Sequence, residues 1–133
     1  MKILVKIILN LITLGAIGFA IYAYFNPVLW IFRFTSSDAV LHVTGSAVVS
    51  CLTVFALPNV KRGVLLFWMC SVSVLAEVAQ PLLTHRRELS FSDIGANGLG
   101  VLIGVGLASA SLYAISQLIS LIKKKKNPRS AAL

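Results

Sequence analysis

Charged side chains are scarce in this sequence. They make up 12% of its 133 residues, and only four are acidic, whereas soluble domains carry roughly 25% charge. So few charges cannot cover the surface of a soluble globule of this length. The two cysteines, Cys51 and Cys70, lie in apolar runs and fit small hydrophobic residues better than a disulfide framework. Composition therefore excludes a soluble domain and a disulfide scaffold.

Apolar residues are abundant instead. They make up 58% of the chain, and the mean hydropathy is +0.92, which also excludes a disordered chain. Four apolar runs approach or exceed the roughly 20 residues that cross a bilayer. We predict one all-α domain over residues 1–133, an integral membrane bundle of four transmembrane helices. Their expected ranges are about 7–25, 39–57, 63–83 and 94–122, followed by a basic tail over 123–133.

The basic residues predict the orientation of these helices. Nine of the twelve Lys and Arg flank one side of the predicted spans and three flank the other, and the basic side of a membrane protein faces the cytoplasm. Both termini should therefore be cytoplasmic. We expect the first run to be a retained span, because it is longer than a signal peptide's apolar core and no cleavage pattern lies near Phe25. We expect no nucleic-acid partner, because the Lys123–Lys126 run fits a topology anchor that also contacts anionic lipid.

Glu77 interrupts the third apolar run about six residues before its outer end. A charged residue at that depth is energetically costly and usually faces a bundle interior or a cavity. Gln80 follows three residues later, on the same helix face. We therefore predict a ligand-binding or catalytic role for Glu77.

Polar residues share one face of the second predicted helix as well. Asp38, His42 and Gly45 follow one another at spacings of four and three, which places them on one side of a helix. The carboxylate can hold the imidazole in one tautomer or stabilise its charged form.

The fourth predicted helix has a third polar face. Ser90 and Asp93 have the spacing of a helix cap, and Asn97 continues the face of Asp93. Gly100 and Gly104 follow on it as a GxxxG pair, which allows a neighbouring helix to approach closely. The neighbouring helix can belong to the same chain or to a second copy of it. A homo-oligomer through this helix therefore stays open.

The three polar faces should meet at the outer level of the membrane, where the second and fourth helices begin and the third ends. Arg86 and Arg87 lie in the loop between the last two helices and can pair with Glu77 or Asp93. A simpler alternative is that these polar side chains only hold the helices together by hydrogen bonds. Asp38 and Asp93 also suit helix N-termini electrostatically.

The polar residues form a string that resembles the VanZ-like family of bacterial integral membrane proteins over about residues 38–104. It consists of Asp38-x-x-x-His42, Glu77-x-x-Gln80 and Arg87-x-x-Ser90-x-x-Asp93-x-x-x-Asn97-x-x-Gly100. Ala39 departs from the pattern, because the family often has Lys there. The resemblance implies a small cell-envelope protein with a shared polar site and a link to glycopeptide antibiotic resistance. It implies no defined chemistry.

Several function classes remain open. A binding protein would hold the phosphate of an anionic lipid or lipid-linked glycan on Arg86 and Arg87, helped by Gln80, Ser90, Asp93 and Asn97. An enzyme acting on the same molecule would use Glu77, His42 and Asp38 as acid and base candidates. A small transporter or proton carrier and a purely structural assembly subunit are the alternatives. The spacings contain no metal-ligand set, and we expect no cofactor.

Overall fold

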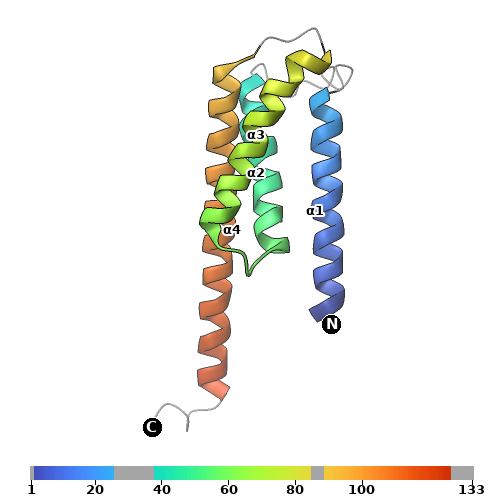
Figure 1. Ribbon diagram of the computed structural model, residues 1–133. Helices are drawn as coiled ribbons and strands as arrows, with labels where there is room; N and C mark the ends of the chain where they lie inside the picture. The colour runs from blue at the N-terminus through green and yellow to red at the C-terminus, as the bar shows by residue number, and fades with distance from the viewer. Residues whose placement is uncertain (1, 26–37, 85–88, 127–133) are drawn as a thin grey trace.

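The computed structural model describes residues 2–25, 38–84 and 89–126, and these residues form a helical bundle (Figure 1). Each of its helices is long and apolar enough to cross a membrane. The helices are α1 (Lys2–Phe25), α2 (Asp38–Ala56), α3 (Arg62–Thr84) and α4 (Phe91–Lys126). The predicted all-α architecture is therefore confirmed. The first and last helices are longer than expected: α1 begins at Lys2, and α4 extends from Phe91 to Lys126.

Local sequence signals explain where the helices begin and end. Asp93 donates its backbone N–H to the Ser90 Oγ at 3.2 Å, so the predicted cap of α4 is confirmed. At the other end of the bundle, Pro58 and Asn59 form the turn that separates α2 from α3. The helices therefore alternate in direction, and α2 and α4 begin at the same end at which α3 finishes (Figure 1).

The closest packing in the bundle is between α2 and α4, and two glycines of α4 allow it. A Cβ atom on Gly100 would collide with the Val43 carbonyl oxygen, and one on Gly104 would collide with the Ala47 carbonyl oxygen. The predicted close approach is therefore confirmed, but the neighbour is α2 of the same chain. Because α2 covers this face, a homo-oligomer through α4 would have to use other residues than Gly100 and Gly104.

Apolar side chains of three helices pack below the polar end of the bundle. This core contains Val54 of α2, Leu65 of α3, and Val101, Val105 and Ala108 of α4. Helix α1 lies to one side, mainly beside α2 (Figure 1). Its buried Thr13 bonds to the carbonyl of Leu9 in its own helix and reaches the Leu52 carbonyl of α2 at 3.3 Å. Helices α2, α3 and α4 therefore form the unit that positions the polar residues.

Candidate functional site: a carboxylate–histidine cluster

The polar faces of α2, α3 and α4 meet at one end of the bundle. The first three turns of α2, the first two turns of α4 and the C-terminal part of α3 supply the side chains, which contact one another across all three helices. This convergence confirms the prediction from helix spacing and alternating direction. We call the group the polar cluster; its members are Asp38, His42, Ser46, Glu77, Asp93 and Asn97.

Glu77 is the most deeply buried charged residue of the cluster, with 1% of its surface exposed. Asn97 Nδ2 donates a hydrogen bond to Glu77 Oε1 at 3.1 Å. His42 Nδ1 lies 3.5 Å from the same carboxylate oxygen. The Glu77 side chain on α3 is therefore held from both α4 and α2, as its predicted interior position requires.

Asn97 connects the helices through both ends of its amide. Its Oδ1 accepts a hydrogen bond from Ser46 Oγ at 2.7 Å and lies 3.3 Å from His42 Nδ1. The Nδ1 atom of His42 thus faces two acceptor oxygens, one from Asn97 and one from Glu77. The network therefore assigns a hydrogen to Nδ1, and in the neutral ring Nε2 carries the lone pair.

The other ring nitrogen of His42 faces two further carboxylates. Nε2 lies 3.8 Å from Asp38 Oδ1 and 3.8 Å from Asp93 Oδ2. The predicted pairing of Asp38 with His42 is confirmed as a contact, and Asp93 joins it from α4. The Asp38 side chain is 38% exposed and that of Asp93 is 14% exposed, so the cluster is open to its surroundings on the Nε2 side of the ring.

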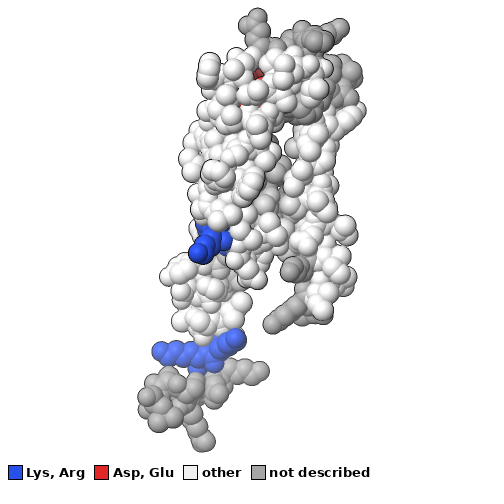
Figure 2. Space-filling model, in the orientation of Figure 1, with Lys and Arg blue, Asp and Glu red and all other residues white. Residues whose placement is uncertain are grey.

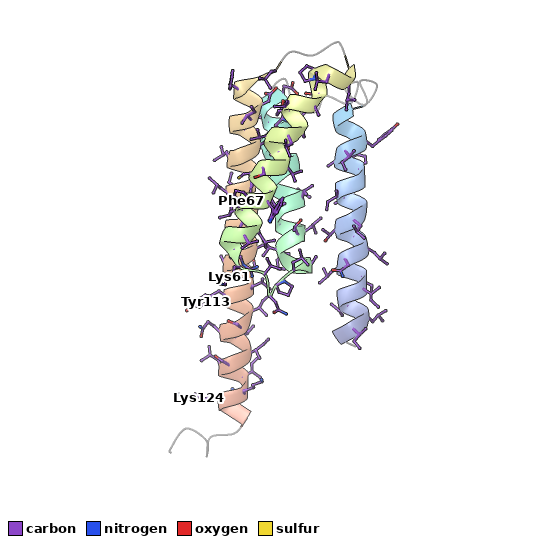
Figure 3. All side chains as sticks on the ribbon, in the orientation of Figure 1. Lys61, Phe67, Tyr113 and Lys124 are labelled. Atoms are coloured by element: carbon purple, nitrogen blue, oxygen red, sulfur yellow. The ribbon has the colours of Figure 1, made fainter. Side chains whose placement is uncertain are left out.

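Negative charge dominates the part of the cluster that the structure describes. Its three ionised carboxylates would carry three negative charges, and a protonated His42 would offset one of them. On the face shown in Figure 2, only a small area of Asp or Glu is visible, near one end, and the visible Lys and Arg lie farther along the bundle. Lys61 and Lys124 are both remote from the end at which α2 and α4 begin (Figure 3). An additional positive group would therefore stabilise the cluster.

The remaining predicted residues have different outcomes. Gln80 is 2% exposed, one turn beyond Glu77. Ser90 acts as the cap of α4 described above. Arg86 and Arg87 lie outside the described residues, so their pairing with Glu77 or Asp93 stays a prediction.

Sequence reasoning misplaced one residue of α2 and missed its neighbour. Gly45 was expected on the face of Asp38 and His42, but it is exposed and has no neighbouring atom within 4 Å of a built Cβ. Ser46, four residues after His42, occupies that face and bonds to Asn97. The signal was the repeated spacing of four from Asp38 through His42 to Ser46.

No family model, no curated protein and no solved structure matches the chain. The resemblance to the VanZ-like family therefore stays a prediction. The geometry of the polar cluster is what supports a functional proposal.

Proposed function

We propose that the chain is a multi-pass protein of the bacterial plasma membrane, with both termini in the cytoplasm and the polar cluster in the outer leaflet. Four helices of sufficient length and hydropathy support membrane insertion. The nine-to-three division of the Lys and Arg residues supports the orientation. The cluster then lies at the depth of lipid head groups.

The polar cluster binds the anionic head group of a lipid or lipid-linked glycan. If the protein is an enzyme, the cluster also modifies that head group. The observation that carries this proposal is the burial of Glu77 at 1% exposure between side chains of α2 and α4. An ionisable residue inside a membrane helix is costly and usually marks a functional site. The helix dipole explains Asp38 and Asp93 in the first turns of α2 and α4, but it cannot explain a carboxylate two turns before the end of α3.

Phosphate is the part of the head group that we propose Arg86 and Arg87 recognise. They follow α3 and precede the Ser90 cap of α4, so the chain brings them next to the cluster in sequence. Arginine binds phosphate through two parallel hydrogen bonds. The amides of Asn97 and Gln80 suit the hydroxyl or amide groups of a glycan. The VanZ-like resemblance adds the proposal that this binding affects glycopeptide antibiotic susceptibility.

Native mass spectrometry of the purified protein tests the proposal. A charged hydrogen bond contributes roughly 1.5–3 kcal/mol, so Arg87→Gln should weaken binding of the copurifying lipid by about 10- to 100-fold without unfolding the bundle. Asn10→Ala in α1 is the control and should keep the lipid. Equal lipid retention by the wild type and Arg87→Gln would contradict the proposed binding of the head group.

A proton carrier is the second candidate, because His42 contacts carboxylates through both ring nitrogens. Such a chain of titratable groups can pass a proton between them. Proteoliposomes with an internal pH dye distinguish the two functions. A carrier would dissipate a pH gradient and lose this activity in His42→Gln, whereas a head-group binder would leave the gradient intact.

A further inference from the structure

We propose that Asp38, His42 and Asp93 form a binding site for a divalent cation of the Zn²⁺ or Mn²⁺ type, which bridges the cluster to the phosphate of the head group. The proposal rests on the proposed function in its last part, since the bridging role requires an anionic ligand. The cation site itself stands on the geometry of the three side chains. One ligand atom of each lies within 4.8 Å of those of the other two.

The distances within this group suit a shared cation. Zn²⁺ binds imidazole nitrogen and carboxylate oxygen at about 2.0–2.2 Å, so two of its ligand atoms lie up to about 4 Å apart. In the structure, His42 Nε2 lies 3.8 Å from an oxygen of Asp38 and 3.8 Å from an oxygen of Asp93. Both distances are longer than a hydrogen bond and stay within the roughly 4 Å that can separate two ligand atoms of one ion.

The surroundings of His42 prepare its Nε2 atom for a metal. A metal-binding histidine usually donates its other ring N–H to a carboxylate or carbonyl oxygen, which fixes the tautomer and the ring orientation. Here Nδ1 faces Asn97 Oδ1 at 3.3 Å and Glu77 Oε1 at 3.5 Å. Glu77 and Asn97 are both buried. They direct the Nε2 lone pair toward Asp38 and Asp93, the only other carboxylates among the described residues.

The charge of the cluster also favours a cation. Three carboxylates surround one imidazole, and the described Lys and Arg are remote from them (Figures 2 and 3). Charge buried in an apolar bundle is strongly unfavourable unless an opposite charge or a bound ion offsets it. A divalent ion on the side where Asp38 is 38% exposed would offset the charge of both aspartates and remain reachable from outside the bundle.

The ligand types select the class of ion. Imidazole suits Zn²⁺ and other transition metals, and carboxylate suits Mn²⁺, Mg²⁺ and Ca²⁺, so a mixed set favours Zn²⁺ or Mn²⁺. Three protein ligands leave at least one position open on such an ion. A phosphate oxygen of the head group would fill that position. The negative cluster would then attract an anion through the metal, in addition to any contact with Arg86 and Arg87.

Electron paramagnetic resonance of Mn²⁺ tests the site in the full-length protein, purified in detergent without a polyhistidine tag. Loss of the free Mn²⁺ signal measures affinity, and nitrogen coupling in the spin-echo spectrum reports a bound imidazole. The sequence has only two histidines, His42 and His85. We expect one bound Mn²⁺ with nitrogen coupling that disappears in His42→Gln and persists in the matched control His85→Gln.

The carboxylates provide a second matched comparison. Asp38→Asn and Asp93→Asn should each weaken Mn²⁺ binding by about tenfold or more, whereas Glu88→Gln should leave it unchanged. Asp38 is half-exposed at the start of α2, so its variant keeps the test valid if Asp93→Asn does not fold. Zn²⁺ should displace the bound Mn²⁺. Absence of specific Mn²⁺ binding, or loss of binding in the His85 and Glu88 variants instead, would overturn the cation site.

Failure of the cation site and failure of the proposed function give different results. If head-group binding stands without the cation, Arg87→Gln reduces the retained lipid while Asp93→Asn and a chelator do not, and the bridging inference is wrong. If the cation binds but Arg87→Gln, Asp93→Asn and the chelator all leave the retained lipid unchanged, the cation site is correct and the head-group proposal fails. If both hold, the chelator and Arg87→Gln each reduce lipid retention.

Discussion

At the scale of single residues, Asn97 connects the three helices of the polar cluster. Its amide donates to Glu77 on α3 and accepts from Ser46 on α2, at 3.1 and 2.7 Å. Removal of one partner from a buried hydrogen bond costs about 1–3 kcal/mol, because the other partner stays unsatisfied. The stability of the cluster should therefore depend more on this amide than on any other polar group of α4.

Asn97→Ala should lower the free energy of unfolding in detergent by about 1–3 kcal/mol. Asn10→Ala, which removes an amide from the less closely packed α1, is the matched control and should change stability by less than about 0.5 kcal/mol. Thermal unfolding followed by circular dichroism measures both. Equal stability of the two variants would contradict the role of Asn97 as a connection between helices.

Glu77 and Arg87 provide a further test at this scale, because their pairing is predicted from sequence alone. Removal of one partner from a buried ion pair costs about 3–5 kcal/mol, so Glu77→Ala should destabilise the protein. Addition of Arg87→Ala should recover part of that loss. A double-mutant cycle of unfolding free energies measures the coupling, and purely additive losses would show that the two residues do not interact.

At the scale of helices, the contact of α2 with α4 sets the geometry of the cluster. Gly104 has no room for a Cβ, because the Ala47 carbonyl oxygen of α2 occupies that space. Gly106, two residues later in the same helix, has no neighbouring atom within 4 Å of a built Cβ. The two glycines therefore form a matched pair for the same substitution.

Gly104→Ala should destabilise the protein by about 1–3 kcal/mol, since it forces α2 and α4 apart. Gly106→Ala should leave stability unchanged or raise it by up to about 1 kcal/mol, because alanine is the better helix former. Thermal unfolding of the two variants under the same conditions checks this. Destabilisation of both to the same extent would contradict the packing of α2 against α4.

The helices also show which features the sequence determines clearly. Long apolar runs bounded by proline and capping residues predict all four helices, and spacings of three and four residues predict that Asp38, Glu77 and Asp93 share one end. Ser46 was missed because serine hydroxyls often bond to their own helix, as Ser71 and Ser111 do. The Asp38–His42–Asp93 group was expected to converge but not to form a metal-ligand set, because its ligand atoms come close only after α2 and α4 pack together.

At the scale of the whole molecule, the alternating helices separate most of the basic residues, nine of the twelve Lys and Arg, from the cluster. The starts of α1 and α3 and the end of α4 carry Lys or Arg, whereas the opposite end carries the acidic residues of the cluster. Such a division is typical of a membrane protein with a fixed orientation. The proposed outer position of the cluster depends on this orientation.

Reporter fusions test the orientation. A fusion after Val60 should report the cytoplasm, and a fusion after Glu88 should report the outer side, because the positive-inside rule places Lys61 and Arg62 in the cytoplasm. Alkaline phosphatase and green fluorescent protein activities in whole bacteria give the two readings. The opposite pattern would place the cluster on the cytoplasmic side.

The most direct test of the head-group site is the thermal stability of the purified protein with added lipid. A ligand that binds only the folded protein stabilises it, by about 2.7 kcal/mol at 100 times its dissociation constant. Phosphatidylglycerol should raise the unfolding temperature of the wild type more than zwitterionic phosphatidylcholine does, and Arg87→Gln should reduce this difference. Equal shifts with both lipids in the wild type would contradict recognition of an anionic head group by the polar cluster.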